Sequence, residues 1–210
     1  GASAYSVAVF HLMTHAFFKA LLFLSAGSII IALHHEQNIF RMGGLRKSMP
    51  LVYACFLIGG AALAAVPLID AGFYSKDRIL WEAYATGNTD LFAAGLLGAF
   101  LTSLYTFRLI FVVFHGKAQT EAHAGHGVAH HLPLIVLMVL STFVGAGITP
   151  PLDGVLPVTG IPAAMESSHH MIEIVAAVVA LSGIALAALL FLGERRVVTS
   201  LANSAIGRPV

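Results

Sequence analysis

The sequence predicts an all-α fold, a polytopic transmembrane helix bundle of about five spans that includes one discontinuous helix. Composition is the first reason. Of the 210 residues, 58% are hydrophobic and only 10% are charged, and the mean hydropathy is +0.88, values typical of polytopic membrane proteins rather than soluble domains. The second reason is that apolar segments of about 20 residues or more, long enough to cross a hydrocarbon core, recur between polar stretches.

Polar connections and turn-forming residues divide the chain into five apolar segments. We expect spans at about residues 4–33, 51–87, 91–114, 132–152 and 171–192. The linker between the third and fourth spans is rich in histidine, which raises the question of a metal site; its histidines are His115, His123, His126, His130 and His131. We expect a solvated loop there, without a metal.

The second segment, from Leu51 to about Gly87, is too long for one straight span. Its roughly 37 residues would extend about 55 Å as an unbroken helix, whereas a hydrocarbon core is about 30 Å thick. Pro67 removes a backbone donor, and Asp70 and Gly72 supply self-bonding or flexible backbone just after it. We therefore expect two half-helices that meet inside the membrane, an arrangement typical of transporter ion sites.

Lys76 lies about one turn beyond this break. A lysine near the middle of a membrane costs roughly 2.5 to 3.5 kcal/mol even on the lenient insertion scale, so its presence favours a functional role. Nearby half-helix ends could stabilise or destabilise the ammonium, which suits a proton gate. The structural alternative is a lysine that reaches the far interface together with Asp77, Arg78 and Glu82.

The first span carries a polar stripe. His11, His15 and Lys19 follow one another at intervals of four residues, so they share one helix face, and Thr14 and Ser25 add hydroxyls to the same span. Histidine and a desolvated lysine can both accept and release protons, which predicts one wall of a hydrated path. Structural hydrogen bonding inside the bundle is the alternative. A metal site at His11 and His15 is disfavoured because no carboxylate or thiolate lies nearby within the membrane.

The distribution of basic residues predicts the orientation. Seven of the eleven Lys and Arg residues fall in connections or the tail on one side of the alternating spans: Arg41, Arg46, Lys47, Lys117, Arg195, Arg196 and Arg208. By the positive-inside rule, this side is cytoplasmic. The connections 34–50 and 115–131 and the C-terminal tail are then cytoplasmic, and residues 87–90 and 153–170 periplasmic.

Several function classes are excluded by what the sequence lacks. The single cysteine, Cys55, lies in an apolar run, so no disulfide or iron–sulfur cluster is expected within these residues. The sequence has no GxGxxG and no Walker loop, and a net charge of +1 gives no indication of nucleic-acid binding. The opening GASAYSVAVFH lacks a basic n-region, so we expect no signal peptide and an internal piece of a longer protein.

Several stretches carry a family resemblance. HLMTHAFFKALLFLSAGSIIIA (residues 11–32), HEQNIFRMGGLRKSMPL (35–51), GFYSKD (72–77), GAFLTSLYTFRLIFVVFHG (98–116) and LPLIVLMVLSTFVGA (132–146) closely resemble the distal antiporter-like membrane subunits of bacterial proton-pumping NADH:quinone oxidoreductase, respiratory complex I. The resemblance covers essentially the whole chain. It implies the second half of an antiporter-like core plus two extra spans, with the first repeat and a long lateral helix lying elsewhere in the same subunit.

The resemblance divides the chain into three parts: residues 1–116 from the second antiporter-like repeat, a histidine-rich cytoplasmic linker at 117–131, and two packing spans with the start of a tail at 132–210. It also assigns a proton pathway, to His11, His15, Lys19, Lys76 and Asp77. Support along the axis is expected from Thr14, Ser25 and Arg108, although Arg108 also suits a simple snorkelling arginine near the third span's end. The middle antiporter-like subunit has glutamate in place of Lys76, which favours the distal assignment.

The implied function is a proton-translocating membrane subunit that couples quinone reduction elsewhere in the complex to proton transfer, in the bacterial inner membrane. No redox active site, cofactor or metal is expected in this chain, because FMN, iron–sulfur clusters and quinone belong to other subunits. Its partners are then lipid and other membrane-arm subunits. Two alternatives remain: the large subunit of a multisubunit Na⁺/H⁺ antiporter, and a membrane scaffold that transports nothing.

Overall fold

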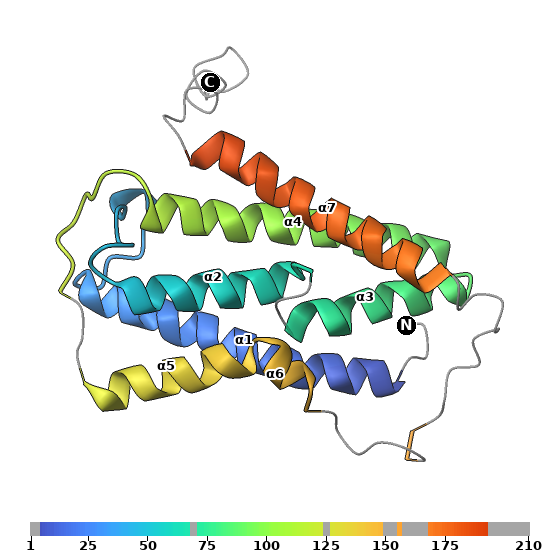
Figure 1. Cartoon of the computed structure of the whole chain (residues 1–210). Helices are drawn as coiled ribbons and strands as arrows, with labels where there is room; N and C mark the ends of the chain where they lie inside the picture. The colour runs from blue at the N-terminus through green and yellow to red at the C-terminus, as the bar shows by residue number, and fades with distance from the viewer. Residues whose placement is uncertain (1–4, 68–70, 124–126, 149–154, 157–167, 193–210) are drawn as a thin grey trace, which may run out of the picture.

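The computed structural model describes residues 5–67, 71–123, 127–148, 155–156 and 168–192, and these form a bundle of helices joined by loops (Figure 1). Its elements are α1 (Tyr5–Ala32), the short 3-10 helix η1 (Ile39–Arg41), α2 (Pro50–Ala64), α3 (Ala71–Ala85), α4 (Thr89–Phe114), α5 (Val128–Leu140), α6 (Phe143–Ala146) and α7 (His169–Phe191). The expected all-helical membrane bundle is confirmed. The tail arginines at 195, 196 and 208, and most of connection 153–170, lie outside the described residues.

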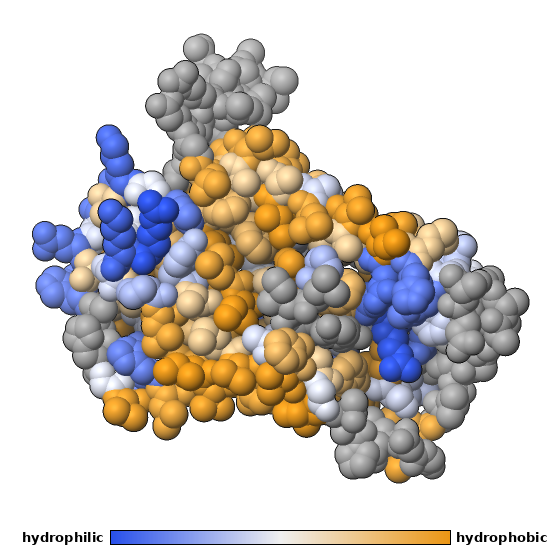
Figure 2. Space-filling model, viewed as in Figure 1, coloured by the Kyte–Doolittle hydropathy of each residue, from blue (hydrophilic) through white to orange (hydrophobic). Residues whose placement is uncertain are grey.

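Three helices of the described chain, α1, α4 and α7, are long and apolar enough to cross a membrane, while α2 and α5 are shorter apolar helices. Large apolar side chains cover the outside of the bundle: Phe23 is 73% exposed, Ile31 70% and Leu189 79%. Figure 2 shows this hydrophobic surface across the middle of the molecule, with hydrophilic side chains gathered at the two ends. Such a surface is stable only against lipid or protein partners.

We call the two ends of the bundle the basic end and the far end. The basic end holds the connection 33–49 and residues 115–123, with Arg41, Arg46, Lys47 and Lys117. The far end holds the first turn of α1, the α3–α4 connection and the first turn of α7 (Figure 1). Between them, fully buried side chains from five of the described helices form the main core, among them Leu21, Cys55, Ile110, Leu134 and Ala187.

The second span is interrupted as expected, and the break begins before Pro67. Ala65 adopts the left-handed conformation (φ 58°) and its N–H bonds back to the carbonyls of Ala61 and Ala62, while the Val66 N–H reaches Ala61 at 3.0 Å. This is a Schellman-type ending that satisfies the last carbonyls of α2 without water. Asp70 lies outside the described residues.

Gly72 serves a different purpose from the one its sequence position predicts. It lies in the first turn of α3, and a Cβ placed there would overlap the carbonyl of Ala62 in the last turn of α2. The two half-helices approach so closely that only glycine fits. Close backbone approach, rather than flexibility, therefore explains this residue.

The expectation of an unbroken fourth span is wrong. α5 ends at Leu140, and α6 begins at Phe143 after a two-residue interruption. The Ser141 hydroxyl donates to the Leu137 carbonyl at 2.7 Å, and the Thr142 hydroxyl donates to the Val139 carbonyl at 2.6 Å, so side chains replace helix continuation locally. Hydropathy missed this because the segment stays apolar throughout. α6 contacts α3 and α1, so the two interrupted spans are neighbours.

The last span packs closely against α4, and Gly183 lies at the contact. A Cβ at this position would overlap the Ser103 hydroxyl and lie 2.7 Å from the Phe100 carbonyl oxygen of α4. Small residues let transmembrane helices approach in this way, and van der Waals packing then replaces the hydrophobic driving force available in water. The contact is consistent with the expectation that this is a packing span.

Replacing Gly183 with valine should destabilise the α4–α7 pair by about 1–3 kcal/mol, because the added carbon atoms have no space. The matched control is Gly98→Val in α4, where a Cβ has no neighbour within 4 Å. The thermal unfolding midpoint of the detergent-purified full-length protein measures the difference. Equal midpoints for the two variants would contradict the close contact.

Gly72→Ala should force the two half-helices apart and reduce the amount of assembled protein. Gly27→Ala in α1 is the control, since its Cβ meets nothing within 4 Å and alanine is about 1 kcal/mol better than glycine inside a helix. Immunoblotting of membranes for the full-length protein provides the measurement. Normal assembly of the Gly72 variant together with unchanged stability would show that α2 and α3 lie further apart than described.

Candidate functional site

The polar side chains of α1 meet the interrupted span at Ser75. The His11 Nδ1 lies 2.9 Å from the Ser75 hydroxyl oxygen, and the Thr14 hydroxyl donates to that same oxygen at 3.0 Å. Thr14 also lies 3.1 Å from the His11 carbonyl, and Ser75 lies 3.3 Å from the carbonyl of Gly72. Ser75 and Thr14 are both fully buried. Residues 61 to 64 positions apart in the sequence thus form one hydrogen-bonded group.

A hydroxyl both donates and accepts, so this group can pass a proton. Ser75 can give its hydrogen to the His11 ring nitrogen or receive one from it, depending on the ring tautomer. Its neighbour Lys76 lies partly buried in the first turns of α3 and interacts electrostatically with His11. The arrangement therefore brings an imidazole, two hydroxyls and an ammonium together at the start of a half-helix.

His15 and Lys19 continue the stripe along α1 towards the basic end. The His15 ring centroid lies 5.8 Å from that of His11 and 5.1 Å from that of Phe18. The Lys19 Nζ lies 6.0 Å from the Phe23 ring centroid. Lys19 also lines a mainly apolar cavity of about 200 Å³ together with Thr106 of α4. The stripe is thus continuous in space, although its members do not hydrogen-bond directly to one another.

Two buried hydroxyls beyond Lys19 lack a hydrogen-bond partner of good geometry within the described chain: Ser25 of α1, which lies beside the Cys55 thiol, and Thr106 of α4. A buried hydroxyl without a partner is costly and usually indicates an ordered water. Ser25 was expected from the sequence to support the axis, whereas Thr106 received no role. Several polar residues lie close to it in the sequence, among them Ser103 and Tyr105, so Thr106 did not stand out.

His130 was expected to lie in a solvated loop, but it belongs to α5 and is partly buried. Its Nε2 lies 2.8 Å from the Ser28 hydroxyl oxygen of α1. Ser28 already donates to the Leu24 carbonyl at 2.9 Å, so its oxygen accepts and the histidine Nε2 carries the hydrogen. The Nδ1 of His130 is buried with no partner among the described residues, which leaves an acceptor available. His130 thus extends the polar contacts of α1 to the basic end.

His115 also departs from the solvated-loop expectation. Its Nδ1 faces the Arg46 guanidinium at 3.5 Å, and its Nε2 lies 2.9 Å from the Tyr53 hydroxyl oxygen. An arginine can only donate, so Nδ1 accepts, and Nε2 carries the hydrogen that is given to tyrosine. Burial, and then the nearby Arg46 charge, holds the pKa of His115 below its usual range. The His115 imidazole is therefore neutral and has a structural role.

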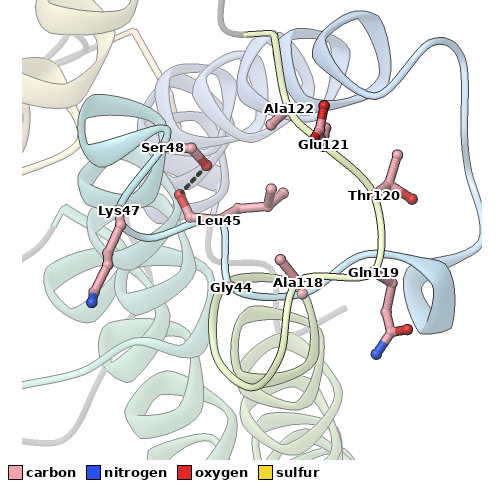
Figure 3. Close-up of a pocket in the computed structure, with 10 residues that line it drawn as sticks. Gly44, Leu45, Lys47, Ser48, Ala118, Gln119, Thr120, Glu121 and Ala122 are labelled. Atoms are coloured by element: carbon pink, nitrogen blue, oxygen red, sulfur yellow. Dashed lines mark hydrogen bonds between the residues drawn. The ribbon is translucent and has the colours of Figure 1, made fainter.

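The two connections at the basic end pack against each other. The Thr120 hydroxyl donates to the Arg41 carbonyl at 2.9 Å, and a Cβ at Gly43 would overlap the carbonyl of Lys117. Between the connections lies a hollow of about 300 Å³, into which Leu45 points while Lys47 and Gln119 point away (Figure 3). Because these polar side chains face outward, the hollow has the character of a loop contact rather than a binding site.

Asp77 lies on the face of α3 that packs against α7. Its side chain is only 5% exposed, accepts a hydrogen bond from the Arg78 backbone N–H at 2.7 Å and faces Glu173. Asp77 therefore lies beside Lys76 in the sequence but is oriented towards a different helix from the one that carries His11.

Arg108 lies apart from the stripe. Its guanidinium carbon lies 5.3 Å from the Phe191 ring centroid and 5.9 Å from that of Phe40, distances suited to cation–π contacts. This position near the basic end fits the snorkelling interpretation. Of the predicted site residues, the structure thus brings His11, Thr14 and Lys76 together around Ser75, with His15 and Lys19 following along α1.

Ser75 is the residue that sequence reasoning missed. It precedes Lys76 within the quoted GFYSKD stretch, yet it received no role because serine is common in apolar helices. The available signal was its position in the first turns of a half-helix, where side-chain hydroxyls frequently replace backbone partners.

Comparisons with known proteins agree with this architecture. Residues 1–102 match the family described as NADH:quinone oxidoreductase/Mrp antiporter, TM. The chain is 66% identical over 208 residues to NADH-quinone oxidoreductase subunit L of Escherichia coli and 65% identical over 208 residues to that of Pseudomonas aeruginosa, covering 99% of this chain and 34% of each relative. Against subunit L of Buchnera aphidicola from Acyrthosiphon pisum, the identity is 49% over 184 residues, 88% of this chain and 30% of the relative.

The chain thus spans about a third of the length of the curated relatives that it matches. The matched membrane family and the apolar helices together show that the chain is part of a multi-pass membrane protein. The chain belongs to the family of antiporter-like membrane subunits that includes NADH-quinone oxidoreductase subunit L.

Proposed function

We propose that this chain is part of a proton-translocating membrane subunit of an NADH:quinone oxidoreductase, where it moves protons while quinone is reduced elsewhere in the complex. One observation carries the proposal: the 2.9 Å contact between His11 and Ser75, which joins the titratable stripe of α1 to the half-helix that bears Lys76. The relatives named subunit L support the choice of complex. The assignment of individual residues rests on the geometry around that contact.

The proposed path runs along α1 from Lys19 through His15 and His11 to Ser75 and Lys76. The 5.8 Å between the two histidine ring centroids leaves no direct hydrogen bond in this conformation, and one bridging water closes such a gap. Ser75 then passes the proton across the helix contact by exchanging its donor and acceptor roles. Like charges on His11 and Lys76 repel each other, so the two groups favour holding a proton in turn.

The interruption of the second span provides a means to control the proton affinity of Lys76. The carbonyls at the end of α2 favour a nearby positive charge, whereas the N–H groups at the start of α3 disfavour it. A small relative movement of the half-helices therefore changes proton affinity at Lys76. Transport against a membrane potential requires such a change, of at least about 2.3 kcal/mol per proton for each 100 mV.

We infer the direction of proton movement from the placement of the basic residues. Four basic residues of the described connections lie at the basic end: Arg41, Arg46, Lys47 and Lys117. On the positive-inside rule, this end would face the bacterial cytoplasm and the far end the periplasm. Protons would enter beside His130 and Ser28, which hydrogen-bond at 2.8 Å, and leave from Lys76 past Asp77.

The proposal assigns no redox centre to this chain. FMN, iron–sulfur clusters and quinone would be held by other subunits of the complex. The exposed apolar surface fits lipid, the remaining part of the same subunit, including its first repeat and lateral helix, and neighbouring membrane-arm subunits. Residues 1–116 would belong to the second antiporter-like repeat, 117–131 to a cytoplasmic linker, and 132–210 to two packing spans with a tail.

A second candidate is the large subunit of a multisubunit Na⁺/H⁺ antiporter, since the matched family is described by both names. Partner proteins discriminate between the two. Purification with flavin and iron–sulfur polypeptides supports the oxidoreductase. Their absence, together with sodium-driven proton exchange in vesicles, would favour the antiporter.

Ser75→Ala in the full-length subunit should slow proton translocation by about twofold to tenfold, the rate equivalent of losing one hydrogen bond worth about 0.5–1.5 kcal/mol. Ser103→Ala is the matched control, because Ser103 is equally buried and bonds only within α4 to the Phe100 carbonyl at 2.8 Å. The measurement is the initial rate of NADH-driven proton uptake into vesicles, recorded together with the number of protons taken up per NADH oxidised. Equal initial rates in both variants would exclude Ser75 from the path.

Lys76→Ala, assembled at the normal level, should lower the number of protons translocated per electron, whereas Lys117→Ala at the exposed basic end should leave it unchanged. Removal of the ammonium leaves no group at that position to hold the proton. The same vesicle measurement applies. An unchanged proton-to-electron ratio in Lys76→Ala would support the scaffold alternative, in which this region transports nothing.

A further inference from the structure

Two histidines and a glutamate gather where α7 begins at the far end of the bundle. His169 and His170 are its first two residues, and Glu173 follows one turn later. One possible ligand atom from each residue lies within 4.8 Å of those of the other two. The His170 Nδ1 is 3.0 Å from the Glu173 Oε2, so two of the three residues are already in contact. None of the three belongs to the proposed proton path.

Neighbouring residues of α3 hold this group in position. The Trp81 ring meets the His169 ring edge-on, with centroids 4.8 Å apart, which fixes the imidazole plane. Beneath it, Leu80 packs with Ile172 and Ala176 in a small separate core. The α3–α7 contact is therefore a packed interface that positions one histidine before any ligand binds.

A further carboxylate faces the group. Asp77, 5% exposed, lies close enough to Glu173 for electrostatic interaction, so two acidic side chains approach each other in a shielded position. Two carboxylates so close together repel each other unless a proton or a cation lies between them. His170 remains open to solvent, with its side chain 87% exposed, and provides an entry route.

We propose that His169, His170 and Glu173 bind a divalent transition-metal cation, with Zn²⁺ as the best-suited ion. Zinc takes imidazole nitrogen and carboxylate oxygen at about 2.0–2.2 Å in a tetrahedral arrangement, which separates neighbouring ligand atoms by roughly 3.3 Å. The His170 and Glu173 atoms, already 3.0 Å apart, fit this spacing, and the His169 ligand atom lies within 4.8 Å of both. Asp77 or a water completes the four ligands.

Charge and chemistry favour this ion over the alternatives. Calcium and magnesium prefer sets of oxygen ligands, whereas a pair of imidazoles selects zinc, copper or nickel. The cation would also relieve the repulsion between the Glu173 and Asp77 carboxylates. Bound there, it would tie the first turn of α7 to α3, one residue from Lys76. The three proposed ligands lie outside the proposed proton path, and only Asp77 is shared with it.

Zinc binding to the purified complex that contains the full-length subunit tests the proposal. The complex is loaded with ZnCl₂, freed of excess ion by gel filtration, and its zinc content is measured by atomic emission spectrometry. We expect the His170→Ala, Glu173→Gln double variant to hold one zinc fewer per complex than the wild type. The matched control is His123→Ala with Glu121→Gln, an exposed histidine and glutamate pair at the basic end, which should retain the wild-type content.

Cobalt binding gives a spectroscopic readout that does not depend on measuring the number of metal ions per complex. Co²⁺ in a tetrahedral site of nitrogen and oxygen ligands absorbs strongly in the visible range, so the wild-type-minus-variant difference spectrum should contain these bands. Glu173→Gln alone keeps the side-chain shape and should weaken Zn²⁺ affinity by about tenfold or more. Equal zinc content in the wild type and the double variant, or no cobalt difference spectrum, overturns the site.

Discussion

A membrane offers no water to an interrupted helix, and this constraint governs the centre of the structure. Each backbone N–H or C=O group left unpaired in hydrocarbon costs several kcal/mol, so the break in the second span must be satisfied by protein. Ala65 and Val66 return their N–H groups to the last turn of α2, and Gly72 lets the first turn of α3 lie against that turn. The two half-helices can then meet without a gap.

The same break explains why polar side chains gather beside it. Ser75 in α3 is fully buried, and α1 supplies His11 and Thr14 as its partners. In a low-dielectric interior such a group rigidifies the contact when all members are satisfied. Its hydroxyls can each donate or accept, so the hydrogen bonds that stabilise the interruption are the same ones that the proposed proton path uses.

The two ends of the bundle differ in whether their charged side chains are exposed or buried. At the basic end the cations remain exposed, and His115 is held neutral between Arg46 and Tyr53. At the far end, acidic side chains are drawn into the α3–α7 interface, where Asp77 faces Glu173. Buried carboxylates require a counter-charge, and the histidines at the start of α7 offer the means to hold one.

Hydropathy and spacing determined the all-helical membrane fold, the interruption near Pro67 and the stripe of His11, His15 and Lys19, because each of these depends on residues close together in the chain. Tertiary structure decided the rest. The pairing of His11 with Ser75 spans 64 positions and that of Ser28 with His130 spans 102, so only helix packing could reveal them. The second interruption, at Ser141, escaped notice because a hydroxyl that bonds its own helix leaves the apolar pattern intact.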